Sequence, residues 1–290
     1  MGFILGILQS FLNATGMVLG KIVLENKKIG NNLQTLFNRS YHFFIIIILF
    51  YIGIFHFELN KIDFTYKEYL IIIIATAGLY ITYPLRRIAY ASEKVSVLQP
   101  FAMLFQVFPI IIGFIFIASE KANFITFISA LVASFIVILP NIKINSLKIN
   151  KYCLMVLTSS IIKSFQVFST IYFLTKLNSA NFYLLESILV IIFSIILMLY
   201  KSEFGEFKKL EKSYVKLMMF VNSIVIVSIL LALTMYSTLG IVTTSLLSLL
   251  YLIFVYIIGF FVLKEIPSKK DIVITVLVSL CIMIGMYFKN

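Results

Sequence analysis

The chain has 290 residues, of which 61% are hydrophobic and only 12% are charged. A water-soluble core of this size cannot bury so much apolar surface, so the composition excludes an ordinary soluble domain and indicates a protein embedded in lipid. The net charge of +12 comes largely from lysines in short links between apolar runs, where they anchor loops, so we expect no nucleic-acid partner.

Ten apolar runs follow one another along the chain, each close to the roughly 20 residues that a helix needs to cross a bilayer. They cover residues 3–24, 33–57, 68–90, 95–118, 122–141, 152–175, 180–200, 214–235, 240–263 and 271–287. The first run is not preceded by basic residues and contains no signal-peptide cleavage site, so we interpret it as the first membrane helix rather than a signal peptide. The sequence therefore predicts an all-α membrane protein with ten transmembrane helices.

The two halves of the chain follow the same plan. Residues 89–120 and 234–265 each contain a helix end, a short polar link, a long apolar run and one closing glutamate. Aligning Glu120 with Glu265 shifts one segment against the other by half the length of the chain. An odd number of helices per unit makes the second unit enter from the opposite side, as in many secondary transporters. We therefore expect two inverted five-helix repeats, residues 1–145 and 146–290.

Ionisable residues at membrane depth are costly and usually face a cavity or a partner, which makes them candidates for function. Aligning the first helices of the two repeats pairs Asn13 with Lys163, and aligning the second helices pairs Arg39 with Glu186. Opposite charges thus occupy equivalent places. We expect a central cavity with the substrate-binding residues Lys163, Glu186, Asn13, Gln9, Gln106, Gln166, Tyr80, Tyr83 and Arg87.

Two interpretations of the central charges stay open. In the functional one, Lys163 meets an anionic group of the solute and Glu186 sets the protonation of that lysine. In the other, Lys163 and Glu186 simply neutralise each other between helices, since charges in a low dielectric rarely stay unpaired.

The remaining basic residues near the membrane core differ in their expected roles. Arg87 is chosen over Arg86 as the arginine that faces the interior, because Arg87 shares a helix face with Tyr83. Arg39 and Lys21 lie within about two turns of their helix ends, so we expect both side chains to extend toward the lipid headgroups.

The signatures of soluble enzymes and pumps are missing from the sequence. There is no Walker-type phosphate loop, and His42 and His56 have no partner acid at ligand spacing. Cys153 and Cys281 have neither metal-like nor disulfide-like spacing. We therefore predict no metal, no cofactor and no enzymatic activity.

Several of the repeated features also carry a family resemblance. They are the helix end Ala89–Tyr90, the small-residue link Val95–Ser96, the internal glycines Gly113 and Gly259, the closing Glu120 and Glu265, and Lys21 and Arg39. On these positions the chain resembles the drug/metabolite transporter superfamily, EamA type, over essentially its whole length. The resemblance implies ten helices in two inverted repeats, transmembrane transport and cytoplasmic termini.

The chain also departs from that family. Pro109 is out of register with the usual proline of the fourth helix, and tryptophan is missing from the first helix. The links on the side of the termini carry fewer lysines than the opposite links, which by the positive-inside rule places the termini outside. The orientation of the chain is therefore left open.

Interior cations outnumber interior acids, which favours an anionic or zwitterionic solute such as an amino acid. We expect a secondary transporter that moves this metabolite by alternating access in a bacterial inner membrane, as a monomer or homodimer, with a proton at Glu186 as the candidate coupling ion. The alternatives are a lipid-linked substrate flippase, which needs a lateral opening lined by lysine and arginine, and a non-transporting membrane scaffold.

Overall fold

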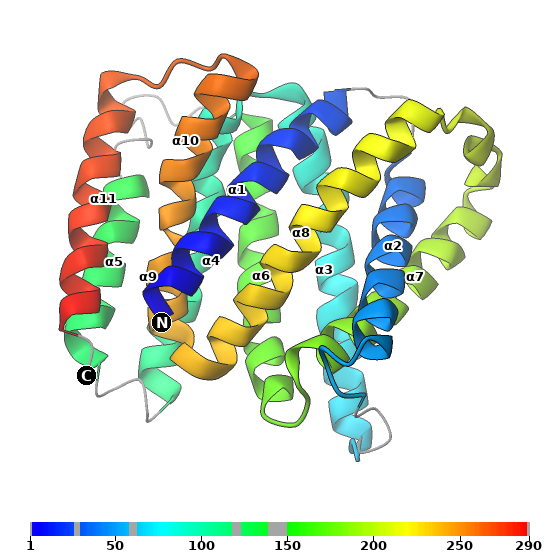
Figure 1. Cartoon of the computed structure of the whole chain (residues 1–290), viewed down its shortest axis with the longest axis horizontal. Helices are drawn as coiled ribbons and strands as arrows, with labels where there is room; N and C mark the ends of the chain where they lie inside the picture. Colours follow the sequence, from blue (N-terminus) through cyan, green and yellow to red (C-terminus); the bar gives the residue numbers. More distant parts are fainter. Residues whose placement is uncertain (1, 26–29, 58–62, 118–122, 139–149, 289–290) are drawn as a thin grey trace.

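The computed structural model describes residues 2–25, 30–57, 63–117, 123–138 and 150–288. Every regular element in this part of the chain is a helix, as Figure 1 shows. The elements are α1 (Gly2–Glu25), α2 (Asn31–Tyr51), α3 (Tyr66–Ser92), α4 (Val95–Phe116), α5 (Phe124–Ile138), α6 (Lys151–Leu174), α7 (Ser179–Tyr200), the 3-10 helix η4 (Glu203–Lys209), α8 (Lys212–Leu239), α9 (Ile241–Ser248), α10 (Leu250–Leu263) and α11 (Lys269–Tyr287). The predicted all-α class is confirmed.

The described helices have the length and surface of membrane spans. Eight segments of the described chain are long and apolar enough to cross a bilayer: α1, α2, α3, α6, α7, α8, the continuous α9–α10 segment and α11. α4 has 22 residues, none of them charged, and α5 is a shorter apolar helix. Large apolar side chains such as Ile74, Phe165 and Phe261 are mostly exposed on the outside of the bundle. A multi-pass integral membrane protein accounts for this surface, because lipid rather than water covers it.

Two of the expected apolar runs do not form one continuous helix over their whole length. The second run was expected to extend to residue 57, but α2 ends at Tyr51. Gly53 stops it by adopting a left-handed conformation with φ +77°, and Ile54 N–H donates to the Leu49 carbonyl. The run at 240–263 is interrupted at Leu249, which separates α9 from α10.

Local hydrogen bonds explain where two of the helices begin. Thr65 caps α3, and its side chain accepts from the backbone of Glu68 while the Glu68 carboxylate accepts from the backbone of Thr65. Ser268 and Asp271 form the same reciprocal arrangement at the start of α11. These capping boxes satisfy amide groups that a helix leaves free at its first turn.

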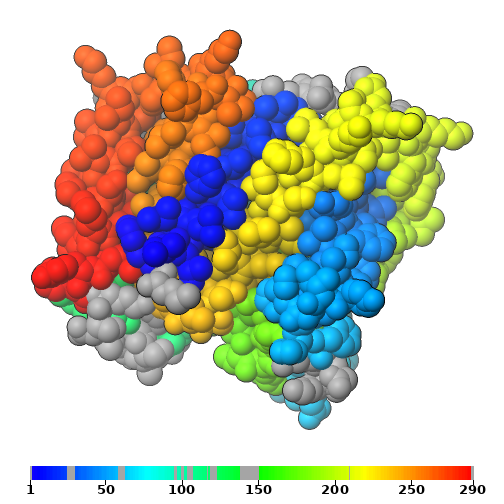
Figure 2. All heavy atoms as spheres, viewed as in Figure 1, coloured from blue at the N-terminus to red at the C-terminus, as the bar shows by residue number. Residues whose placement is uncertain are grey.

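Helices from the two halves of the chain are interleaved in the bundle. α1 packs along α8 and α10, while α6 packs along α3 and α4. α2 packs against α7, and α5 packs against α11. Figure 1 shows α1 and α8 running side by side across the near face, and Figure 2 shows that their side chains meet along this face. Both ends of the described chain lie toward the same end of the bundle (Figure 1).

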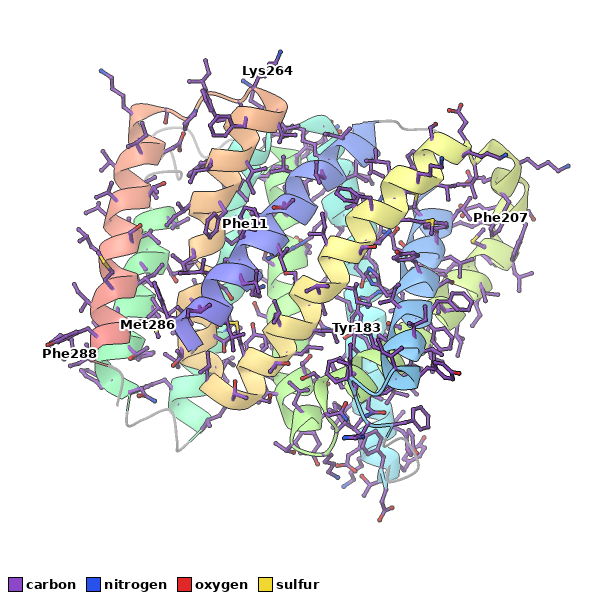
Figure 3. All side chains as sticks on the ribbon, viewed as in Figure 1. Phe11, Tyr183, Phe207, Lys264, Met286 and Phe288 are labelled. Atoms are coloured by element: carbon purple, nitrogen blue, oxygen red, sulfur yellow. The ribbon has the colours of Figure 1, made fainter. Side chains whose placement is uncertain are left out.

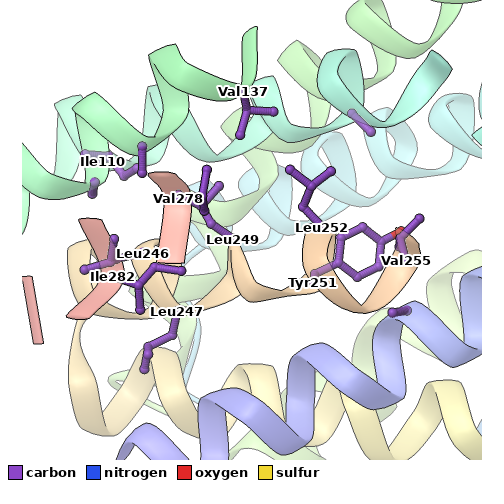
Figure 4. Packing of buried hydrophobic residues seen from close by; sticks show 14 of the residues in the cluster. Ile110, Val137, Leu246, Leu247, Leu249, Tyr251, Leu252, Val255, Val278 and Ile282 are labelled. Carbon is purple, nitrogen blue, oxygen red and sulfur yellow. The ribbon is translucent and has the colours of Figure 1, made fainter. Parts of the chain in front are cut away.

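A large buried cluster lies mainly between α4, α5, α9, α10 and α11, and α1, α3, α6 and α8 also contribute to it. Leu246, Leu249 and Leu252 of the α9–α10 segment meet Val278 and Ile282 of α11 there (Figure 4), and all five side chains are essentially inaccessible. In lipid there is no hydrophobic force between helices, so close packing of such side chains holds the helices together.

A glycine allows α11 to approach its neighbours closely. The Gly285 carbonyl accepts a hydrogen bond from the Thr126 hydroxyl of α5 at 2.8 Å. A Cβ atom at Gly285 would lie 2.5 Å from Leu246 Cδ2 and 3.0 Å from Ser129 Cβ. By contrast, a Cβ atom at Gly259 of α10 would meet nothing within 4 Å.

These two glycines give a matched test of the packing. Gly285→Val should lower the melting temperature of the detergent-purified protein, because overpacking costs about 1–3 kcal/mol. Gly259→Ala should leave it unchanged or raise it, since alanine favours a helix interior over glycine by about 0.5–1 kcal/mol. Equal melting temperatures for the two variants would contradict the described approach of α11 to α5 and α9.

Candidate functional site

A cavity of about 270 Å³, the central cavity, lies inside the bundle. Helices from both halves of the chain form its walls, chiefly α1, α3, α6, α7 and α8. Its polar and charged lining consists of Gln9, Asn13, Arg39, Tyr83, Arg86, Tyr90, Lys163, Gln166, Thr170, Tyr183, Glu186, Ser228, Tyr236, Ser248 and Tyr251. The described lining therefore contains three cations and one acid.

Most of the residues that the sequence suggested for a binding site come together here. Six of them line the central cavity: Gln9, Asn13, Tyr83, Lys163, Gln166 and Glu186. Arg87 lies instead in a neighbouring cavity. The side chain of Gln106 is outside the described residues.

Tyr80 does not line the central cavity. Its hydroxyl donates to Asn32 Oδ1 at 2.7 Å, and its ring contacts Phe193 of α7. Three residues of a helix turn through about 300°, which leaves Tyr80 and Tyr83 about 60° apart around the axis. This rotation directs Tyr80 toward the contact of α3 with α2 and α7.

Arg39 of α2 and Glu186 of α7 form a buried ion pair at the cavity wall. Arg39 Nη2 lies 3.0 Å from Glu186 Oε1, and the two side chains are only 8% and 6% exposed. Arg39 also donates to the Tyr83 hydroxyl, and its guanidinium lies 5.0 Å from the centre of the Tyr183 ring. Gln166 Nε2 donates to the second carboxylate oxygen of Glu186 at 2.9 Å.

This ion pair corrects one expectation and refines another. Arg39 does not extend to the headgroups, because α7 offers it a carboxylate inside the bundle. The second interpretation, in which Lys163 and Glu186 neutralise each other, now has to include Arg39, which forms an ion pair with Glu186. Lys163 lines the same cavity as this pair.

The sequence analysis expected Lys21 to extend to the lipid headgroups, but this side chain is also paired inside the protein. Its ammonium group lies 3.0 Å from Glu265 Oε1 and 3.4 Å from the carbonyl oxygen of Glu93, and the residue is only 8% exposed. Glu265 follows α10 and Glu93 follows α3. Lys21 therefore ties the end of α1 to two other segments.

A second cavity, of about 250 Å³, adjoins the central one and lies among α1, α2, α3 and α8. Its lining includes Gln34, His42 and Arg87. The two cavities share Met17, Arg39, Tyr83, Tyr90, Tyr183 and Ile229. Figure 3 marks Tyr183 within the bundle, where its hydroxyl lies 2.7 Å from His42 Nδ1. The shared side chains form the wall between the two cavities.

At the end of the bundle where α3 begins, a charged cluster joins the two halves. Lys176, in the link between α6 and α7, pairs with the Glu68 carboxylate of α3, which also accepts from the Tyr172 hydroxyl. The bond to Glu68 raises the pKa of Lys176. Lys176 thus remains a cation that fastens this link to the start of α3.

Sequence reasoning missed the roles of Arg39, Arg86 and His42. The repeat alignment already placed Arg39 opposite Glu186, so that correspondence was the available signal for their pairing. Arg86 lines the central cavity, where its Nε donates to Ser159 Oγ at 3.0 Å. His42 carried no sequence signal, because its neighbours come from distant parts of the chain.

Comparison with known proteins gives a fold but no family. No family model matches the chain, and no curated protein matches it. A solved structure described only as "Crystal structure of protein" superposes with a TM-score of 0.61 at 11% identity, and the match covers 96% of this chain and 97% of that one. At this identity the likeness shows the fold alone.

The Arg39–Glu186 pair can be tested by a double-mutant cycle. Arg39→Gln and Glu186→Gln should each destabilise the purified protein strongly, because removing one partner of a buried pair costs about 3–5 kcal/mol. The double variant should lose clearly less stability than the sum of the single variants. The control combines Arg39→Gln with Asp271→Asn. The losses of stability from these two changes should add, because the bonds of Asp271 are to Tyr256 and Ser268 and not to the partners of Arg39. Strict additivity for Arg39 and Glu186 would contradict the pairing.

Proposed function

We propose that the chain is a secondary transporter that moves a small anionic or zwitterionic metabolite, amino-acid-like in its charges, across a bacterial inner membrane by alternating access. The observation that carries this proposal is the central cavity, which is lined by helices of both halves and whose charged side chains are mostly cations. Lys163 lies halfway along the 24-residue α6, at the depth where secondary transporters bind their solutes.

We also propose that the chain crosses the membrane ten times, as two inverted five-helix repeats covering residues 1–145 and 146–290. In this scheme α1 to α5 correspond to α6, α7, α8, α9–α10 and α11. Exchanging the repeats converts the α1–α8 packing into α6–α3 packing, and the α1–α10 packing into α6–α4 packing, and all four contacts occur. The α2–α7 and α5–α11 contacts convert into themselves. This pattern supports a two-fold axis between the repeats and the resemblance to the EamA-type drug/metabolite transporters.

The charges of the central cavity indicate the class of solute. Among the described residues that line this cavity, Arg39, Arg86 and Lys163 are cations and Glu186 is an acid, so the lining carries an excess of positive charge. An anionic group on the solute would offset this excess of positive charge. Hydrogen-bonding groups such as Asn13 and Gln9 are available to the polar remainder of the solute. Glu186 is the candidate carrier of a coupling proton, since it is the acid of the described lining.

A flippase for lipid-linked substrates is the alternative function from another class. It requires an opening toward the lipid that is lined by lysine and arginine. The basic residues of the central cavity instead point into a space walled by helices of both halves. This arrangement favours a transporter for a soluble solute over a flippase or a scaffold without transport activity.

Transport through the central cavity can be tested in proteoliposomes with radiolabelled amino acids and small carboxylates. Lys163→Gln should abolish accumulation of the transported solute, because the variant removes the cation that meets the anionic group. Lys151→Gln is a matched control, since Lys151 is exposed at the start of the same helix, and it should transport normally. Both variants should melt within a few degrees of the unaltered protein. Undiminished transport by Lys163→Gln would remove Lys163 from the site.

A further inference from the structure

The second cavity contains an unusual set of unsatisfied polar atoms. Five buried atoms on its walls have no hydrogen-bond partner among the described residues: Gln34 Oε1, Arg39 Nη1, His42 Nε2, Arg87 Nε and Tyr90 Oη. Four of these residues, all except Arg87, are at most 7% exposed. Buried polar groups are nearly always paired, so a cluster of unpaired ones around a single cavity indicates a place for a polar ligand.

Most of the unpaired atoms are donors, and two belong to cations. Arg87 uses one terminal nitrogen to donate to the Asn31 carbonyl at 2.9 Å, which leaves its Nε free. Arg39 uses Nη2 for Glu186 and leaves Nη1 free. A neutral imidazole whose Nδ1 accepts a hydrogen bond from the Tyr183 hydroxyl carries its own hydrogen on Nε2, which makes His42 a third donor.

The neighbouring carboxylates do not occupy these donors. Glu206 of η4 accepts from the Gly30 amide at 2.8 Å. Glu265 pairs with Lys21, at another part of the same cavity. Guanidinium groups with free N–H donors bind carboxylates preferentially, because a carboxylate accepts several charge-assisted hydrogen bonds at once.

Much of the remaining cavity wall is apolar, although Lys21, Thr35, Asn38 and Asn222 also line it. Its apolar side chains come chiefly from α1 and α8 and include Val23, Leu24, Met218, Val221 and Val225. Its volume of about 250 Å³ exceeds the roughly 150 Å³ of an engineered protein cavity that holds benzene. The space therefore suits one small ring or branched chain next to a charged group.

We propose that the second cavity is a binding site for a small organic anion with an apolar body, an aromatic or branched aliphatic carboxylate. Arg39, Arg87 and His42 hold the carboxylate, and the valine-rich wall holds the apolar part. The site is distinct from the central cavity, although the two share Arg39. It does not depend on the chain being a transporter.

The charge requirement is tested by isothermal titration of the detergent-purified protein with benzoate at constant ionic strength. The unaltered protein should bind benzoate and should bind its neutral analogue benzamide much more weakly. Arg87→Gln should weaken benzoate binding by about tenfold or more, the loss expected for a hydrogen bond to a charged group. Lys151→Gln, at an exposed residue that lines neither cavity, should bind benzoate as the unaltered protein does.

The location is tested by a pair of cavity-filling variants, which keeps the proposal testable if Arg87→Gln does not fold. Val225 lines only the second cavity and Ala232 lines only the central one. Val225→Phe should abolish benzoate binding, whereas Ala232→Phe should retain it. Absence of benzoate binding to the unaltered protein, equal affinity for benzamide, or equal binding by the two phenylalanine variants would each overturn the proposal.

The same measurements separate this site from the proposed function. Benzoate binding that is lost in Val225→Phe supports the site even if no solute is transported in proteoliposomes, in which case only the transporter proposal fails. Solute transport that depends on Lys163, together with no benzoate binding, overturns the second site and leaves the transporter proposal standing.

Discussion

The buried ion pair between Arg39 and Glu186 is the interaction on which the interior of this protein depends. Two charges in a low-dielectric bundle are stable only when they meet each other and their remaining hydrogen-bonding groups are satisfied. Tyr83 and Gln166 provide further bonds here, one to each partner. The pair fixes α2 against α7, one helix from each half of the chain. It also occupies the wall between the two cavities, so that a change in it would alter both.

The position of this pair links the repeated sequence to the shape of the interior. Arg39 corresponds to Glu186 in the sequence alignment of the two halves, and their helices α2 and α7 pack directly together. In the proposed inverted repeats, equivalent residues touch where the two-fold axis passes between them, and opposite charges at this position attract each other. Under this proposal the two repeats differ in charge at the position where two identical charges would repel each other most. On either side of this contact, the cavities have different linings and suit different ligands.

The sequence was most informative where one physical constraint dominates. A bilayer needs apolar runs of fixed length, so hydropathy located the helices, and the cost of polar groups at membrane depth singled out Lys163, Gln166 and Glu186. The sequence was least informative where the position of a side chain depends on partners from distant parts of the chain. The distance of Arg39 and Lys21 from their helix ends could not show that Glu186 and Glu265 lie within reach. The second cavity also escaped notice, because its lining combines residues of α1, α2, α3 and α8 that form no motif in the chain.

The most direct test of the inverted arrangement is the side of the membrane on which equivalent links lie. Asp63 lies in the link between α2 and α3, Gly205 lies in the link between α7 and α8, and both are exposed. In a background with Cys153 and Cys281 replaced by serine, Asp63→Cys and Gly205→Cys would be labelled in sealed vesicles with a membrane-impermeant maleimide. Inverted repeats predict that one of the two cysteines reacts from outside and the other only after the vesicles are opened. Reaction of both cysteines from the same side would contradict the account.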